Sequence, residues 1–187
     1  MAKHYDVIVL GAGPAGLTAG IYLGRNRLRT LIVDSATAGG QMVLSHQIAN
    51  YPGIELASGR QISQTMLEQA RHFGSDVISQ GTVTKLDLAG PTKMLEVEDE
   101  GSFEARAVIL APGGTPRSLG LESEQRFKGR GISYCATCDG DFFTGKQIVV
   151  VGGGNSALEE AASLSRYASK VTLVHVLGEF QAYGRAT

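Results

Sequence analysis

The sequence predicts an α/β fold with two Rossmann-like domains, because one pattern of strand, glycine-rich loop, helix and strand occurs twice. The first loop spans Gly11–Gly16 and the second spans Gly152–Ala157. An apolar run precedes each loop, and a second apolar run ends 23 residues after the loop's first glycine, at Asp34 and at His175. This shared spacing indicates two units built on the same plan.

The first unit begins with an apolar strand at residues 5–10 and continues in a helix over about 14–26. Glycines in the connecting loop permit a tight turn, let the backbone approach a pyrophosphate, and let the helix pack closely on the strand. Asp34 ends the next strand, Thr30–Asp34, where a carboxylate can accept hydrogen bonds from both ribose hydroxyls. The loop residues expected to contact a dinucleotide are Gly11, Gly13, Pro14, Ala15 and Gly16.

Gly20 and Gly24 lie on the predicted first helix, four residues apart. Each costs a helix up to about 1 kcal/mol relative to alanine. We expect close packing of this helix face to offset that cost.

The middle of the chain is expected to hold one helix, at residues 59–73, and a small antiparallel sheet inserted in the first unit. Its short alternating segments lie near residues 76–80, 82–88, 93–98 and 102–105. Residues 106–111 indicate a buried strand, and residues 112–131, rich in Gly, Pro and charge, indicate a linker. The second unit is expected to have strands at 147–151 and 171–175, with a helix at 155–168 between them.

The composition argues against a nucleic-acid-binding protein and against a membrane-spanning one. The chain has 187 residues, 43% of them hydrophobic, and a net charge of −1. It has no basic run of the kind that binds nucleic acid, and no apolar stretch near the ~20 residues that cross a membrane. We therefore expect neither nucleic acid nor membrane as a partner. Two cysteines and no export signal favour a cytoplasmic location.

Cys135 and Cys138 are the only cysteines, and Asp139 follows directly. A redox dithiol, a structural disulfide and a zinc site are the three alternatives. The disulfide would close only a short loop, which gives a small entropic gain. Zinc would lack half of its ligands, because the four histidines are scattered. A redox pair beside a proton-carrying acid is favoured, and we assign no metal ligand.

Together these motifs resemble the low-molecular-weight thioredoxin reductases. The resemblance covers essentially the whole chain, and Cys-Ala-Thr-Cys-Asp just before a second glycine-rich loop is its most specific part. The segments that carry it are Gly11–Gly16, Gly39–Gln41, Asn50–Gly53, Lys128–Gly131, Cys135–Asp139 and Gly152–Glu160.

The resemblance implies an FAD-binding domain at 1–113, a linker at 114–130, and a pyridine-nucleotide-type domain carrying the dithiol at 131–187. It implies that Cys138 faces the flavin, Cys135 attacks the disulfide of a thioredoxin-like protein, and Asp139 handles the proton. It also implies a homodimer. Further nucleotide contacts implied in the two domains are Gly39, Gly40, Gln41, Asn50, Val83, Gly113, Gly152, Gly154, Asn155 and Ser156.

The chain departs from the family in two places. Pro112 stands where the family usually has threonine. After His175, where members that use NADPH carry three arginines, this chain has Val176, Leu177 and Gln181. Arginines bind the 2′-phosphate of NADP, so we expect NADPH to be a poor donor. His175 is not the carboxylate that NADH needs. The pattern resembles deeply branching members that lack the NADPH motif.

The donor therefore stays open among ferredoxin, a second flavin, and weak NADPH binding through Lys170 or Arg185. In this family a C-terminal segment returns to the flavin domain, so the chain is expected to be incomplete at its C-terminus. The alternatives to a ferredoxin-linked reductase are an NADPH-dependent thioredoxin reductase and a non-catalytic flavoprotein or redox-sensing binding module.

Overall fold

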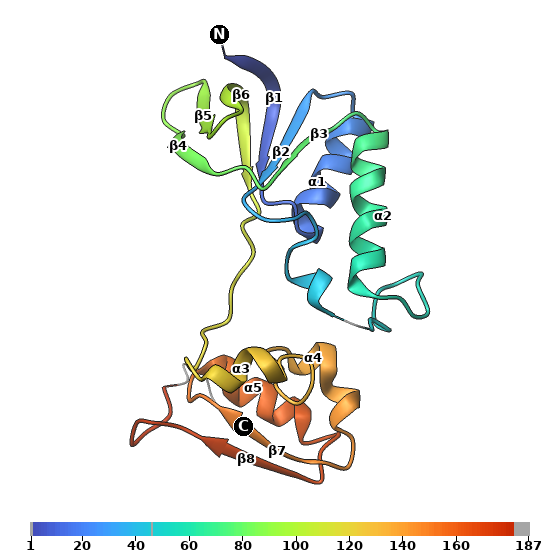
Figure 1. Cartoon of the computed structure of the whole chain (residues 1–187), viewed down its shortest axis with the longest axis vertical. Helices are drawn as coiled ribbons and strands as arrows, with labels where there is room; N and C mark the ends of the chain where they lie inside the picture. The colour runs from blue at the N-terminus through green and yellow to red at the C-terminus, as the bar shows by residue number, and fades with distance from the viewer. Residues whose placement is uncertain (1, 46, 182–187) are drawn as a thin grey trace. The chain divides into compact units, whose positions relative to one another are not determined.

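The computed structural model describes residues 2–45 and 47–181. It divides into two compact units, Met1–Thr115 and Pro116–Thr187 (Figure 1). No helix in these described ranges combines the length and apolar character needed to cross a bilayer.

The first unit is built on one six-stranded sheet with the strand order β3-β2-β1-β6-β5-β4. β1, β2, β3 and β6 run parallel to one another. β5 pairs antiparallel with the first half of β6, and β4 pairs antiparallel with β5. The predicted combination of a parallel sheet with an antiparallel addition is confirmed. The strands are β1 (Lys3–Leu10), β2 (Thr30–Asp34), β3 (Asp76–Ser79), β4 (Val83–Asp87), β5 (Lys93–Val97) and β6 (Gly101–Leu110).

Two details of that prediction were wrong. β3 was expected in the antiparallel sheet, but it pairs in parallel with β2, because a strand reached through a crossover helix returns in the same direction. The segments 102–105 and 106–111 were expected as separate strands. They form the single strand β6, which pairs with β1 on one edge and with β5 on the other.

Two helices pack against the parallel part of the sheet: α1 (Pro14–Arg25) and α2 (Gly59–His72). α2 begins with a capping box between Ser58 and Gln61, which satisfies free N–H groups at the helix start. A first cluster of buried apolar side chains lies between these helices and the sheet. A second cluster packs apolar side chains of β1 and β2 against those of β5 and β6. The sheet is therefore buried on both faces, as parallel sheets usually are. The first cluster includes Val9, Leu17, Ile32, Ile62, Met66 and Ala70; the second includes Ile8, Leu31, Val33, Leu95, Val97 and Phe103.

The close packing expected of α1 is confirmed. A Cβ added to Gly20 would lie 2.4 Å from Ile32 Cδ1 of β2. One added to Gly24 would lie 2.4 Å from the carbonyl oxygen of Phe73, at the end of α2. Glycine therefore lets α1 approach both the sheet and its neighbouring helix.

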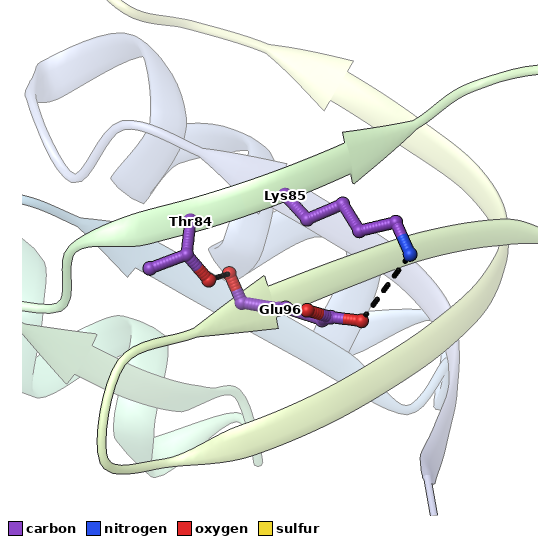
Figure 2. A network of polar contacts seen from close by, with 3 residues as sticks. All are labelled: Thr84, Lys85 and Glu96. Atoms are coloured by element: carbon purple, nitrogen blue, oxygen red, sulfur yellow. Dashed lines mark hydrogen bonds and ion pairs between the residues drawn. The ribbon is translucent and has the colours of Figure 1, made fainter.

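The hairpin of β4 and β5 contains an irregularity at Thr84, where the register shifts. Figure 2 shows the polar contacts of Thr84 and Lys85 with Glu96 of the neighbouring strand. The Thr84 hydroxyl donates to the Glu96 carbonyl at 3.3 Å. Lys85 Nζ lies 3.6 Å from Glu96 Oε1, and both side chains are exposed to solvent. An exposed pair of this kind contributes little stability, so the apolar face of the hairpin holds it on the sheet.

The second unit contains the predicted strand, loop, helix and strand. β7 (Gln147–Val151) and β8 (Lys170–Val174) pair in parallel, and α5 (Asn155–Leu164) connects them. α5 is shorter than the predicted 155–168, because turns occupy the residues after Leu164. Before β7 lie three short helical segments. These are α3 (Glu122–Phe127), which falls inside the predicted linker, α4 (Ala136–Asp139) and η2 (Gly140–Phe143).

Candidate active site

The first glycine-rich loop begins at Gly11, directly after β1. Its N–H donates to the Val33 carbonyl at 2.8 Å, and its φ of +108° favours glycine. A Cβ at this position would lie 2.0 Å from the Ala111 carbonyl oxygen. A Cβ at Gly16 would lie 1.8 Å from the Gly11 carbonyl oxygen. The loop is therefore closed tightly against the ends of β2 and β6 and against the start of α1.

Asp34, at the end of β2, accepts hydrogen bonds from the backbone of the glycine-rich loop and from the backbone just after β2. Its Oδ2 accepts from the Ala12 N–H at 2.6 Å, and its Oδ1 accepts from the Ala36 N–H at 2.8 Å. Each carboxylate oxygen has two lone pairs, so each can accept one further hydrogen bond. Asp34 is thus held in a fixed orientation and can still accept from the hydroxyls of a ligand.

The second predicted flavin motif lies beside the first. Gly39, with φ of +118°, donates its N–H to the Ala12 carbonyl at 2.7 Å. A Cβ on Gly40 would lie 3.1 Å from Gly13 Cα. Gln41 follows in η1 (Gly40–Leu44), and Pro14 occupies the first turn of α1, where its missing N–H costs nothing. Two motifs far apart in sequence therefore form one glycine-lined surface.

The remaining predicted contacts of the first unit lie on its connecting segments. Val83 begins β4 just after Gly81, whose N–H donates to the Asp34 carbonyl at 2.9 Å. Gly113, with φ of +68°, follows the end of β6. Ala15 is exposed in the first turn of α1, and Asn50 is exposed between η1 and α2.

Cys135 and Cys138 form a disulfide, with their Cα atoms 5.3 Å apart. Cys135 is half-buried and Cys138 is exposed. The Cys138 N–H donates to Cys135 Sγ at 3.2 Å, and the Asp139 N–H donates to the Cys135 carbonyl at 3.1 Å. Hydrogen bonding to a charged form stabilises it, so the first of these bonds would favour a Cys135 thiolate once the disulfide is reduced.

Asp139 is half-buried at the end of α4. The Ser133 hydroxyl donates to its Oδ2 at 2.5 Å, and the Cys135 N–H donates to Ser133 Oγ at 3.1 Å. The three residues thus form one hydrogen-bonded group around the disulfide. Ser133 was not among the predicted site residues, and its position two residues before Cys135 was the only signal for it.

Glu124 of α3 is a second residue of this region that was not predicted from the sequence. Its side chain is buried, with 2% of the residue exposed. Its carboxylate accepts from the Ser118 hydroxyl at 2.5 Å, from the Tyr134 hydroxyl, and from the N–H groups of Leu119 and Gly120 at 3.0 and 3.1 Å. The Ser118 and Tyr134 hydrogen bonds, more than the backbone ones, lower the pKa of Glu124 to about 2. The hydrogen bond with Glu124 also raises the pKa of Tyr134.

The second glycine-rich loop begins at Gly152, whose N–H donates to the Val174 carbonyl at 2.9 Å. The φ of Gly152 is +140°. Gly154, Asn155 and Ser156 follow at the start of α5, and all three are exposed. The backbone plan of the first loop is therefore repeated here.

The segment after β8 lies against this second loop. A Cβ on Gly153 would lie 2.3 Å from the His175 ring, and the Gln181 N–H donates to the Gly153 carbonyl at 2.8 Å. His175 Nε2 lies 3.0 Å from the Glu179 carbonyl oxygen. Residues 175–181 thus fold back onto Gly153, with the Val176 side chain exposed. Arg185, one of the two basic residues considered for NADPH, lies outside the described residues.

Within the described ranges, no group of three or more His, Cys, Asp or Glu side chains is placed to hold a metal ion.

Comparison with known proteins gives consistent matches along the whole chain. Residues 5–186 match the family model for pyridine nucleotide-disulphide oxidoreductases. A thioredoxin reductase of Peptoclostridium acidaminophilum is 42% identical over 183 residues, which cover 97% of this chain and 58% of that protein.

Two solved structures have the same fold. A thioredoxin reductase from Streptococcus pyogenes matches with a TM-score of 0.87 at 41% identity, over 98% of this chain and 59% of that one. A thioredoxin reductase from Giardia duodenalis matches with a TM-score of 0.90 at 34% identity, over 97% of this chain and 59% of that one. The chain thus spans less than two thirds of the length of these relatives.

Proposed function

Since the chain belongs to the pyridine nucleotide-disulphide oxidoreductases, and among them to the low-molecular-weight thioredoxin reductases, we propose that it reduces the disulfide of a thioredoxin-like protein with electrons from FAD. The observation that carries the proposal is the Cys135–Cys138 disulfide with Asp139 directly after it. A binding module has no need of a dithiol and a neighbouring acid, so this group argues against a non-catalytic flavoprotein.

The first unit fits FAD by its backbone and by Asp34. Side chains at Gly11 and Gly16 would collide with neighbouring carbonyl oxygens, so the loop presents bare backbone to a pyrophosphate. Asp34 keeps free lone pairs for ribose hydroxyls, and Gly39, Gly40 and Gln41 lie beside the loop. FAD bound here would supply the electron pair that reduces the disulfide.

The reduced dithiol would then act on the substrate in two steps. The Cys135 thiol gives its proton to Asp139, and the thiolate attacks one sulfur of the substrate disulfide. A mixed disulfide forms, and the second substrate sulfur leaves with the proton from Asp139. Cys138 then loses its proton through Asp139 and attacks Cys135 Sγ. This restores the Cys135–Cys138 disulfide and releases the first substrate sulfur as a thiol, so two electrons and two protons pass to the substrate.

The proposed electron donor is a one-electron protein such as ferredoxin rather than NADPH. Val176, Leu177 and Gln181 offer no guanidinium group to a 2′-phosphate. In addition, His175 and Gln181 lie against Gly153, in the loop where a second nucleotide would bind. An NADPH-dependent reductase remains the second candidate, because the second loop keeps its glycines and its backbone plan.

Anaerobic reduction experiments test this proposal. The FAD-loaded protein is mixed in a stopped-flow instrument with NADPH, NADH or reduced ferredoxin, and flavin absorbance is followed. Fast bleaching by ferredoxin and slow bleaching by both nicotinamides is expected. Rapid, saturable bleaching by micromolar NADPH would select the second candidate. A protein that cannot be loaded with FAD would exclude both.

A homodimer and a cytoplasmic location complete the proposal. The resemblance to thioredoxin reductases implies the homodimer, and a dithiol that works in the reduced state fits a reducing cytoplasm. Sedimentation analysis of the purified protein tests the dimer.

A further inference from the structure

The Ser133 hydroxyl connects the two ends of the dithiol segment. Its oxygen lies 2.5 Å from Asp139 Oδ2 and 3.3 Å from the Cys135 carbonyl oxygen. A hydroxyl has one proton to donate, and an ionised carboxylate is the stronger and here the nearer acceptor. The proton therefore lies toward Asp139, and the hydroxyl oxygen is left to accept from the Cys135 N–H at 3.1 Å.

The other hydrogen bonds of this segment do not orient the Asp139 side chain. The Asp139 N–H binds the Cys135 carbonyl, and the Cys138 N–H binds Cys135 Sγ. Both fix the backbone and the sulfur, but they leave the carboxylate free to rotate. Among the described residues, Ser133 is the partner that holds the carboxylate itself.

We propose that Ser133 is a positioning residue for disulfide exchange, which holds Asp139 through Oδ2 so that Oδ1 carries the proton to and from the sulfurs. This inference rests on the proposed function, which gives Asp139 the proton. Ser133 keeps its own proton throughout and takes no part in the electron transfer. Its role is orientation, and a misplaced catalytic group can lower a rate by about 100-fold.

The alternative is that Ser133 only stabilises the turn before α4 by accepting from the Cys135 N–H. A double-mutant cycle separates the two roles, because residues that act through one another are not additive. The variants are Ser133→Ala, Asp139→Asn and the two combined, each loaded with FAD. Ser165→Ala is the control, since it removes a serine hydroxyl of the same unit that donates to the Ala162 carbonyl and not to Asp139. The dithiol is reduced beforehand, and its reoxidation by oxidised thioredoxin is followed in a single turnover.

Ser133→Ala is expected to lower this rate roughly 10- to 100-fold, as the loss of a hydrogen bond to a charged group predicts. In the Asp139→Asn background the same change should cost less than about threefold. Ser133→Thr keeps the hydroxyl and should restore most of the rate, while Ser165→Ala should change nothing. FAD content and the thermal midpoint report folding. If Ser133→Ala does not fold, Ser133→Val takes its place in the cycle, because valine has the shape of threonine, lacks the hydroxyl and adds no thiol beside the disulfide.

Equal losses from Ser133→Ala in both backgrounds would overturn the inference, and so would no loss in the native background. If Asp139→Asn itself costs less than about threefold, the proton role of Asp139 in the proposed function fails instead. The two failures are therefore distinguishable.

Discussion

The Tyr134 hydroxyl donates a hydrogen bond to the carboxylate of Glu124, which joins helix α3 to the residue directly before Cys135. Glu124 also accepts from Ser118, Leu119 and Gly120, so one buried carboxylate fastens the chain before α3 to the start of the dithiol segment. The Ser133–Asp139 hydrogen bond is a second contact that holds this segment.

Acid should destabilise the second unit through Glu124. The folded-state pKa is about 2, below the ordinary value of 4.5, so the folded state favours the charged form. The stabilisation is complete above pH 4.5 and is lost as the pH falls toward about 2. Glu124→Gln should lower stability at pH 7 and flatten this acid dependence. Urea unfolding of both proteins between pH 7 and pH 3 measures how the free energy of unfolding depends on pH. The same pH dependence in the variant and the unsubstituted protein would contradict the assignment.

Alkali should act on the same contact with the opposite sign. The pKa of Tyr134 is raised above its ordinary value of 10, so the folded state favours the protonated phenol. This stabilisation is present below pH 10 and is lost as the pH rises through the raised value. Tyr134→Phe should remove that part of the alkaline loss. Ultraviolet titration of tyrosinate should show one late-titrating group fewer in the variant.

The close approach of α1 predicts unequal effects of two similar substitutions. A Cβ at Gly24 would meet the Phe73 backbone carbonyl, which cannot easily move, whereas one at Gly20 would meet the end of the Ile32 side chain. Gly24→Ala should destabilise the protein by about 1–3 kcal/mol, because overpacking outweighs the helix-propensity gain. Gly20→Ala should cost less. Chemical denaturation measures both, with Gly114→Ala as the control, since that position has open space around it.

Asp34→Ala should weaken FAD retention and also loosen the loop. The substitution removes the acceptor for the Ala12 and Ala36 N–H groups, in addition to the ribose contacts. Each lost hydrogen bond should contribute about 1 kcal/mol or more. Equilibrium dialysis of the apoprotein with FAD measures the affinity. Affinity equal to that of the unsubstituted protein would show that Asp34 is only a structural residue.

The two cysteines should differ when replaced. Cys138→Ser leaves Cys135 to attack, so a thioredoxin with one active-site cysteine, activated as an aromatic mixed disulfide, should be captured covalently. Cys135→Ser should capture far less, and both variants should retain FAD. Non-reducing electrophoresis with flavin detection reads out both properties. Capture by Cys135→Ser alone would reverse the assigned roles but keep the enzyme class.

Local pattern predicted those parts of the molecule in which residue type and spacing decide the structure. The glycine loops, β2 and the β7-α5-β8 unit follow from apolar runs, tight turns and the spacing from Gly11 to Asp34 and from Gly152 to His175. These are short-range features, and each has a direct physical cause within about 25 residues of chain.

The missed features depend on partners that are distant in the fold or unmarked in the sequence. Glu124 lies in a charged six-residue helix, where its composition gives no sign that Ser118 and Tyr134 would bury it. The pairing of β6 on both edges was hidden as well, because alternation reveals which face is buried but not which strands are neighbours. Ser133 resembles any turn serine until its distance from Asp139 is known.

The position of β1 in the sheet has a consequence for synthesis on the ribosome. Lys3–Leu10 emerges before the other five strands of its sheet, and it can pair with β2 early, but its other neighbour is Gly101–Leu110. Until that strand has left the exit tunnel, one edge of the nascent sheet stays open and can pair with another chain. The first unit should therefore complete its sheet only after residues 101–110 have left the tunnel, and this is the interval in which chaperones would protect it.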